Sequence, residues 1–96
     1  MNDAEKLARI FKLLSVDTRV QMIDLLKQRC LCVNALASRL KITPAAVSQH
    51  VRILRDAEIV IADKRGNFVH YCVNKEVVAR WHKAAEGLLE SDGAKG

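Results

Sequence analysis

The chain has 96 residues; half are hydrophobic and four are aromatic, which suits one domain with a mainly aliphatic core. Its formal net charge of +5 favours a polyanionic partner, and nucleic acid is the first candidate. No apolar run is long enough to span a bilayer, and no signal-peptide core opens the chain, so we expect a cytoplasmic protein with no membrane partner. Thiols stay mostly reduced in that compartment, so Cys30, Cys32 and Cys72 are not expected to form a structural disulfide.

Two amphipathic helices are predicted in the first third of the chain. The first runs from Asp3 to Leu14, where apolar residues recur at helical spacing. The second runs from Thr18 to about Gln28, with Asp17 as its expected N-cap. A short extended piece containing Cys30 and Cys32 follows.

The next two helices form the helix-turn-helix pattern around which the chain is organised. The first covers about Asn34 to Leu40, and Lys41 and Ile42 make the turn. Thr43-Pro44 then begins the second helix, because a threonine hydroxyl caps free N–H groups and proline suits the first helical position. The inward residues of this second helix are Val47, Val51 and Leu54, which leaves a polar outer face.

After Ala57 the periodicity changes to that of a β-hairpin. The predicted strands are Ile59–Ile61 and Phe68–Val73, with residues 62–67 as a basic loop and Gly66-Asn67 as its turn. Asn74 is expected to cap a last helix from Lys75 to about Glu90. We therefore expect residues 1–90 to form one domain, whose expected roles in DNA binding and dimerisation are argued below, and residues 91–96 to be a disordered tail.

The predicted fold is mainly α with a β-hairpin wing, in the order α-α-α-α-β-β-α: a winged helix-turn-helix. Five helices and a hairpin cannot easily cover every apolar stripe in so short a chain, so a homodimer is expected. A dimer would also present two recognition helices to successive major grooves of double-stranded DNA, matching a near-palindromic site. The predicted dimer interface consists of Leu7, Phe11, Trp81, Ala85 and Leu88.

The candidate DNA contacts lie on the second helix of the pair and on the wing. Short polar side chains near a helix start suit base edges, and the candidates for that role are Ser48, Gln49 and His50. The candidates for backbone contacts are Thr43, Arg52, Arg55, Lys64 and Arg65. His50 is also a conceivable metal ligand, and His70, beside the wing, is expected to contact phosphate or simply to be exposed.

The segments FKLLSVDTRVQMIDLLKQ and LCVNALASRLKITPAAVSQHVRILRDAEIVIADKRGNFVHYCVN resemble the ArsR/SmtB family of winged-helix repressors. The resemblance implies a homodimer that binds operator DNA, represses a neighbouring gene, and is released by a metal or metalloid ion or by a thiol-modifying species. Two departures are visible. The family often has glycine where this chain has Lys41, and Asn34 replaces the second cysteine of the family's Cys-Val-Cys-Asp-Leu segment. The family's zinc-type site on the last helix is rejected, because only His82 and Glu86 are present there.

The cysteines are the candidate sensing site. Cys30 and Cys32 fall on one side of an extended chain, and two thiolates could hold a soft ion such as arsenite, Cd, Zn or Cu(I). Cys72 or a residue of a partner chain would be the third ligand. Cys32 also stands at the N-cap of a helix, where a thiol is a poor cap, which suggests another purpose. The alternatives are thiol oxidation or reaction with reactive sulfur at the same residues, or a repressor with a different inducer or none. In that last case Cys30 and Cys72 serve only as small buried hydrophobes.

Two other classes of function are weighed against the repressor. A winged-helix protein-interaction module would need an apolar patch on the recognition helix, where Ala45 and Ala46 are the only small candidates. An enzyme is not expected, because the chain shows no nucleophile–base set, phosphate-binding glycine loop or complete metal site.

Overall fold

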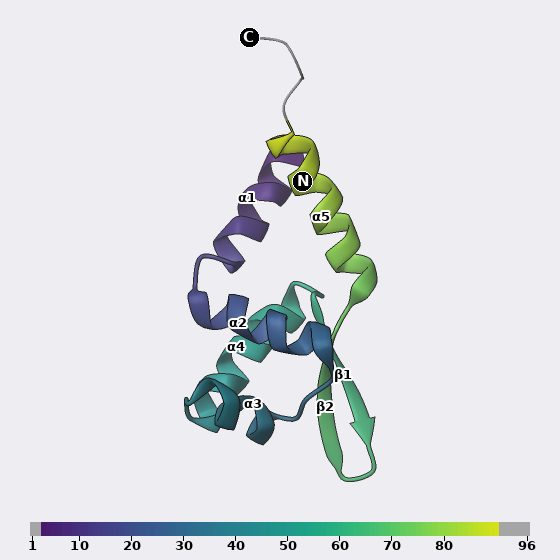
Figure 1. Ribbon diagram of the computed structural model, residues 1–96. Helices are drawn as coiled ribbons and strands as arrows, with labels where there is room; N and C mark the ends of the chain where they lie inside the picture. The colour runs from purple at the N-terminus through teal and green to yellow at the C-terminus, as the bar shows by residue number, and fades with distance from the viewer. Residues whose placement is uncertain (1–2, 91–96) are drawn as a thin grey trace.

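The computed structural model describes residues 3–90, so the expected tail at 91–96 lies outside the described residues. Five helices and two strands follow one another in the predicted order. Their bounds are α1 Asp3–Leu13, α2 Asp17–Gln28, α3 Val33–Leu40, α4 Pro44–Asp56, β1 Val60–Arg65, β2 Phe68–Val73 and α5 Lys75–Leu89. The predicted winged helix-turn-helix is therefore confirmed (Figure 1).

The helix starts agree with the sequence at two of three capping positions. The backbone N–H of Ala46 donates to Thr43 Oγ1 at 3.1 Å, and that of Val77 donates to Asn74 Oδ1 at 3.4 Å. The predicted Asp17 cap is wrong: α2 begins at Asp17, and its N-cap is Val16, which makes no side-chain cap. Asp17 instead occupies the first turn, where a carboxylate interacts favourably with the positive end of the helix.

The hairpin is longer than predicted. Strand β1 continues to Arg65, so residues 62–65, expected as loop, pair with β2 in a regular antiparallel register from Val60↔Val73 to Arg65↔Phe68. Only Gly66 and Asn67 turn the chain, and Gly66 has a φ of +63°, which glycine adopts without a steric cost. Leu31 forms an isolated antiparallel bridge with Tyr71, so the α2–α3 connection lies along the free edge of β2.

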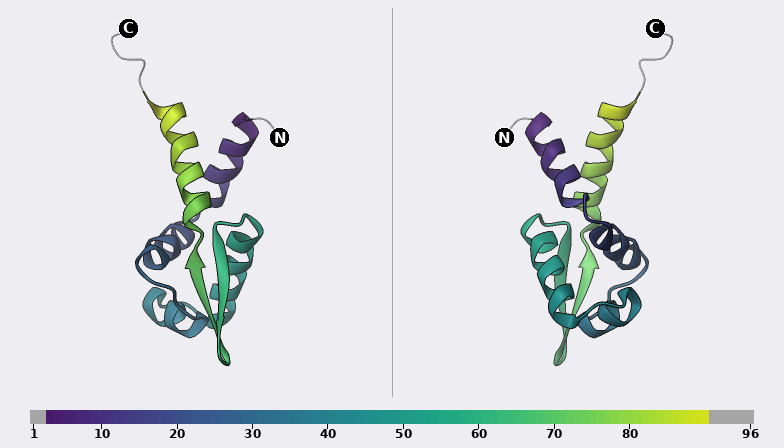
Figure 2. Two further views of the ribbon diagram at one scale, coloured as in Figure 1. Left: turned by 90° about the vertical axis from the view of Figure 1, so that its right-hand side faces the viewer. Right: turned by 90° about the vertical axis from the view of Figure 1, so that its left-hand side faces the viewer.

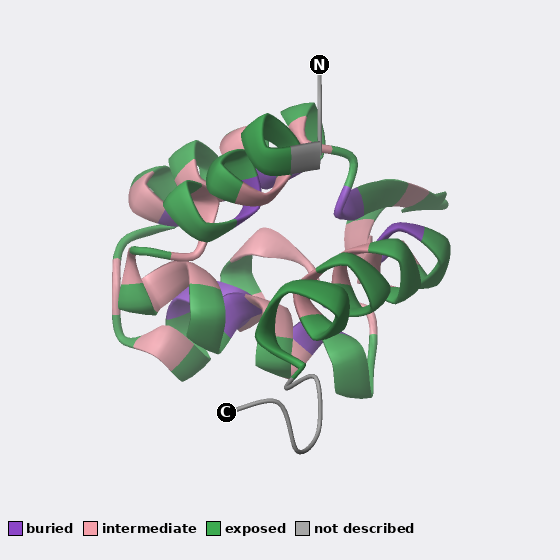
Figure 3. Cartoon of the chain, turned by 90° about the horizontal axis from the view of Figure 1, so that it is seen from above, coloured by how far each residue is buried: buried purple, intermediate pink, exposed green. Residues whose placement is uncertain are grey.

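The core lies between α2, α3, α4 and the hairpin. Its most buried side chains are Met22, Leu36, Val47, Leu54 and Val60. Helices α1 and α5 pack against each other and rise away from this body as two arms (Figures 1 and 2). Most of α5 is exposed along its length (Figure 3). No helix in residues 3–90 is long and apolar enough to cross a membrane.

Candidate nucleic-acid interface and cysteine cluster

The outer face of α4 carries most of the residues predicted to contact DNA. Val47, Val51 and Leu54 point into the core as expected, which turns the remaining faces outward. The predicted contacts that are exposed there are Thr43, Ser48, Gln49, Arg52 and Arg55. The turn before α4 contains Lys41 at φ 58° and ψ 43°, a left-handed backbone that glycine adopts more readily than lysine.

His50 is placed differently from the other candidates. It is half-buried, and its Nδ1 accepts a hydrogen bond from Arg19 Nε of α2 at 3.4 Å. Arg19 also donates from a terminal nitrogen to the carbonyl oxygen of Leu13, at the end of α1, at 3.2 Å. The imidazole thus faces α2, whereas Ser48 and Gln49 face solvent.

Arg55 is held against the wing. Its guanidinium carbon lies 5.9 Å from the ring centroid of Tyr71 on β2, within the range of a cation–π contact. A shallow pocket of about 470 Å³ opens beside this pair. Its lining includes Ser48, Arg52 and Arg55, so three predicted DNA contacts converge on one concave, mostly polar surface.

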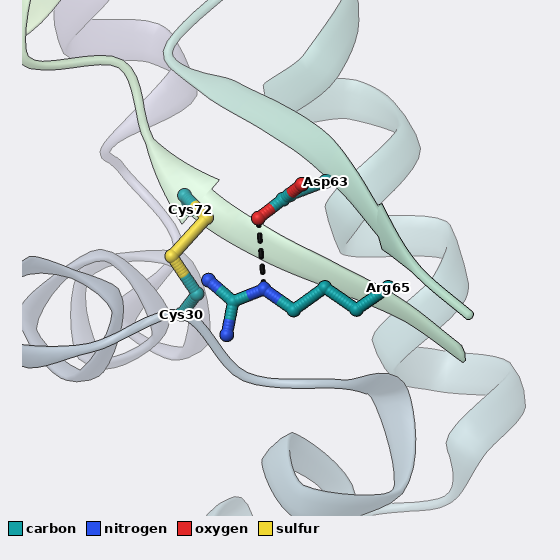
Figure 4. Close-up of a disulfide and its surroundings, with 4 residues drawn as sticks. All are labelled: Cys30, Asp63, Arg65 and Cys72. Carbon is teal, nitrogen blue, oxygen red and sulfur yellow. Dashed lines mark hydrogen bonds and ion pairs between the residues drawn. A yellow bond between two sulfur atoms is a disulfide. The ribbon is translucent and has the colours of Figure 1, made fainter. Parts of the chain in front are cut away.

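The wing presents Lys64 and Arg65 near its tip, both exposed. Arg65 Nε donates to Asp63 Oδ2 at 2.8 Å, and both side chains are about half exposed. Figure 4 shows that the Arg65 side chain runs back from the tip, on the side of the hairpin that carries Cys30 and Cys72. Arg65, which the sequence predicts to contact the DNA backbone, is therefore already paired with the carboxylate of Asp63.

The expectation of free thiols at Cys30 and Cys72 is wrong, because the structure joins them in a disulfide (Figure 4). Their Cα atoms lie 4.4 Å apart although the residues are 42 positions apart in sequence. The reason is the Leu31–Tyr71 bridge, which sets Cys30 directly opposite Cys72 on the neighbouring strand. The bond links the end of α2 to the wing and joins Cys30 to Cys72 rather than to Cys32.

Cys32 is a free, half-buried thiol at the N-cap of α3, where it makes no side-chain cap, as the sequence suggested. His70 is half-buried rather than freely exposed. In the disulfide-bonded form, residues 3–90 contain no group of three His, Cys, Asp or Glu side chains that could hold a metal ion. On α5, His82 Nε2 lies 3.7 Å from Glu86 Oε2, and both side chains are exposed.

The residues expected at the dimer interface lie on the α1 and α5 arms. Leu7, Trp81 and Ala85 are half-buried, whereas Phe11 and Leu88 are 42% and 58% exposed. A groove of about 490 Å³ separates the arms near their base, and Trp81 lines it together with Ile10 and Arg80.

Sequence reasoning missed three residues of this surface. The alternation of a strand puts Asp63 and Arg65 on one face, so their pairing was open to prediction once β1 was extended. No local signal marks Arg19 or Tyr71, because each acts on a residue that only the tertiary fold brings near.

Comparison with known proteins agrees with this architecture. The family model described as "Bacterial regulatory protein, arsR family" matches residues 17–62. A transcriptional repressor SmtB homolog from Synechocystis is 31% identical over 93 residues, which cover 96% of this chain and 70% of that protein. The arsenic resistance transcriptional regulator ArsR1 of Pseudomonas putida is 35% identical over 84 residues, which cover 86% of this chain and 66% of that protein.

Among solved structures, the homodimeric winged helix-turn-helix DNA-binding domain Mb0332 from Mycobacterium bovis is 27% identical, with a TM-score of 0.72. The match covers 88% of this chain and 79% of that one. The sequence match to the SmtB homolog spans nearly the whole chain, and the same fold recurs in the solved structure. The chain therefore belongs to the arsR family of bacterial regulatory proteins.

Proposed function

We propose that the chain is a homodimeric repressor that binds operator DNA through α4 and the wing and is released when its thiols react. The observation that carries this proposal is the exposed polar face of α4 beside a basic hairpin. In this arrangement Ser48 and Gln49 read base edges in the major groove, while Thr43, Arg52 and Arg55 hold phosphates. Lys64 and Arg65 reach the backbone or minor groove next to it. His50, which contacts Arg19, fixes α4 against α2.

The homodimer is supported by the exposed apolar surface of the arms. The described part of α1 packs chiefly on α5, and Phe11 and Leu88 remain largely exposed in one chain. Covering these side chains with the same surface of a second copy removes apolar area from water. The two-fold symmetry of such a dimer matches a near-palindromic operator.

The first candidate for the releasing event is oxidation of Cys30 and Cys72. A hydroperoxide takes two electrons and two protons from the thiols, which form the disulfide, while the oxidant becomes an alcohol and water. The new bond ties the α2–α3 connection to β2 next to Tyr71, whose ring contacts Arg55. The wing then loses freedom to adjust to the DNA backbone while α4 remains in the groove, and operator affinity falls.

A soft metal or metalloid ion such as arsenite, Cd, Zn or Cu(I) is the second candidate effector. It is supported by the cysteine content and by a relative whose name includes arsenic resistance. Ion binding would require the reduced protein, because the disulfide uses two of the three cysteine sulfurs.

Operator binding measured by fluorescence anisotropy tests both parts of the proposal. DNA from upstream of the protein's own gene is titrated with reduced and with hydroperoxide-treated protein, at several salt concentrations. We expect tight binding by the reduced dimer, a steep loss with salt, and at least tenfold weaker binding after oxidation. Mass spectrometry of the same samples reports the disulfide.

The variants Cys30→Ser and Cys72→Ser should bind DNA and ignore the oxidant. Cys32→Ser is the matched control, because it removes a thiol but leaves the disulfide pair, and it should respond like the wild type. Formation of the disulfide without a change in affinity would contradict the redox switch. Absence of DNA binding by the reduced protein would instead favour the protein-interaction module.

A further inference from the structure

One face of the wing brings together more potential metal ligands than the disulfide alone uses. Leu31 and Tyr71 exchange both backbone hydrogen bonds, with N···O distances of 3.0 and 2.8 Å. In an antiparallel ladder the residues on either side of such a pair lie opposite each other at closely spaced positions without hydrogen bonds. One flanking pair is Cys30 and Cys72, and their Cα distance of 4.4 Å agrees with this geometry.

The same register sets Cys32 opposite His70, as the other flanking pair. Residues two apart on a strand share a face, so His70 lies on the face of β2 that carries Cys72. Cys32 stands two residues after Cys30, with an extended backbone at φ −82° and ψ 169°. All three cysteines of the chain and one of its three histidines are therefore neighbours on a single patch, defined by Cys30, Cys32, His70 and Cys72.

His70 supplies an independent observation that points to a ligand. Its Nδ1 is the one buried side-chain nitrogen or oxygen in residues 3–90 that has no hydrogen-bond partner. A buried imidazole nitrogen without a partner is unfavourable, and such groups usually find a hydrogen bond, a water or a metal ion. Cys32, its cross-strand neighbour, is likewise free and makes no cap.

We propose that the reduced protein binds one zinc-like or cadmium-like divalent ion per chain through Cys30, Cys32, Cys72 and His70 Nδ1. Three thiolates and one imidazole are a donor set that suits tetrahedral coordination of such ions. The site forms after a dithiol reduces the disulfide, donating two electrons and two protons and becoming a disulfide itself. Metal binding then releases the thiol protons.

The disulfide and the metal site use the same two sulfurs and exclude each other. An oxidant that joins Cys30 to Cys72 must expel the ion, and a bound ion protects both thiols from oxidation. The inference thus deepens the proposed function by naming the ligand set and the competition between its two candidate effectors. The test of this metal site needs no DNA, so the metal site can be refuted while the proposed DNA binding stands.

Titration of the reduced homodimer with Co²⁺ and Cd²⁺ in the absence of oxygen tests the site directly. Thiolate–metal bonds give intense ultraviolet absorption, and we expect it to saturate at one ion per chain. Oxidised protein should show no such absorption. Added Zn²⁺ should displace Co²⁺ and should slow disulfide formation by hydroperoxide.

Two ligand variants and one matched control define the ligand set. His70→Gln and Cys32→Ser should each weaken binding at least about tenfold. Serine is a better N-cap than cysteine, so Cys32→Ser keeps α3 and tests the site without loss of fold. His82→Gln removes an exposed histidine on α5 and should leave affinity unchanged. The proposal is overturned if His70→Gln and Cys32→Ser bind like the wild type, or if oxidised protein binds equally well.

Discussion

Arg55 of α4 lies over the ring of Tyr71 on β2, with 5.9 Å between the guanidinium carbon and the ring centroid. The backbone of Tyr71 is hydrogen-bonded to the backbone of Leu31, the residue that lies between Cys30 and Cys32 in the chain. One residue of the wing therefore touches both the predicted DNA-binding face and the cysteine patch. The ring also limits the directions in which the long Arg55 side chain can point.

Removal of this ring should weaken operator binding. Tyr71→Leu should lower affinity about two- to fivefold, which corresponds to a cation–π contact of 0.5–1 kcal/mol, because Arg55 loses its orientation. Tyr71→Phe keeps the ring and should bind like the wild type. The anisotropy titration is repeated in an Arg55→Ala background, where Tyr71→Leu should have no further effect; an equal loss there would refute the positioning role.

Neutralising Asp63 should strengthen binding to all DNA. Asp63→Asn releases Arg65 from its 2.8 Å ion pair and removes a negative charge from the wing. Affinity for operator and for unrelated DNA should rise about two- to tenfold at low salt, with a steeper salt dependence. Asp24→Asn removes the same charge from an exposed pair with Lys27 on α2 and leaves the Asp63–Arg65 pair intact. If both variants have the same effect, net charge rather than Arg65 is responsible.

Lys41→Gly should stabilise the fold. Lys41 has a positive φ, which costs a residue with a side chain roughly 1–2 kcal/mol. Glycine removes this cost, but its greater freedom in the unfolded chain offsets part of the gain in stability. The free energy of unfolding in urea should therefore rise by about 0.5–1 kcal/mol. Ser38→Gly, in the body of the same helix, should lower it by about 0.5 kcal/mol. A loss of stability with Lys41→Gly would show that the lysine side chain makes an important contact.

Reduction of the disulfide should destabilise the protein. The bond closes a loop between residues 42 positions apart, and chain-entropy reasoning gives about 2–4 kcal/mol for such a cross-link. Urea unfolding of oxidised and reduced protein measures the difference in the presence of a metal chelator. Cys72→Ser should show no redox dependence, and Cys32→Ser should show the full effect. Equal stability of the two wild-type forms would contradict a link between the bond and folding.

The local features of this protein could be predicted from the sequence because they depend on residues close together in the chain. Thr43 and Asn74 begin their helices by capping free N–H groups three residues away. The inward spacing of Val47, Val51 and Leu54 determined which face of α4 points outward. The start of α2 at Asp17 was missed because it follows from the extended backbone of Val16, which makes no side-chain cap. The length of β1 was missed because residues 62–65 are held by pairing with β2 across the turn.

The tertiary structure alone decided which distant groups meet. Arg19 reaches His50 across 31 positions, so a residue predicted to read bases faces α2 instead. Cys30 meets Cys72 because backbone hydrogen bonds between Leu31 and Tyr71 set the register of two strands, and the same register sets Cys32 opposite His70. Composition and spacing along the chain carry no information on that register. The register is determined when α2, α3, α4 and the hairpin pack around the core. The same register brings the residues of the cysteine patch together.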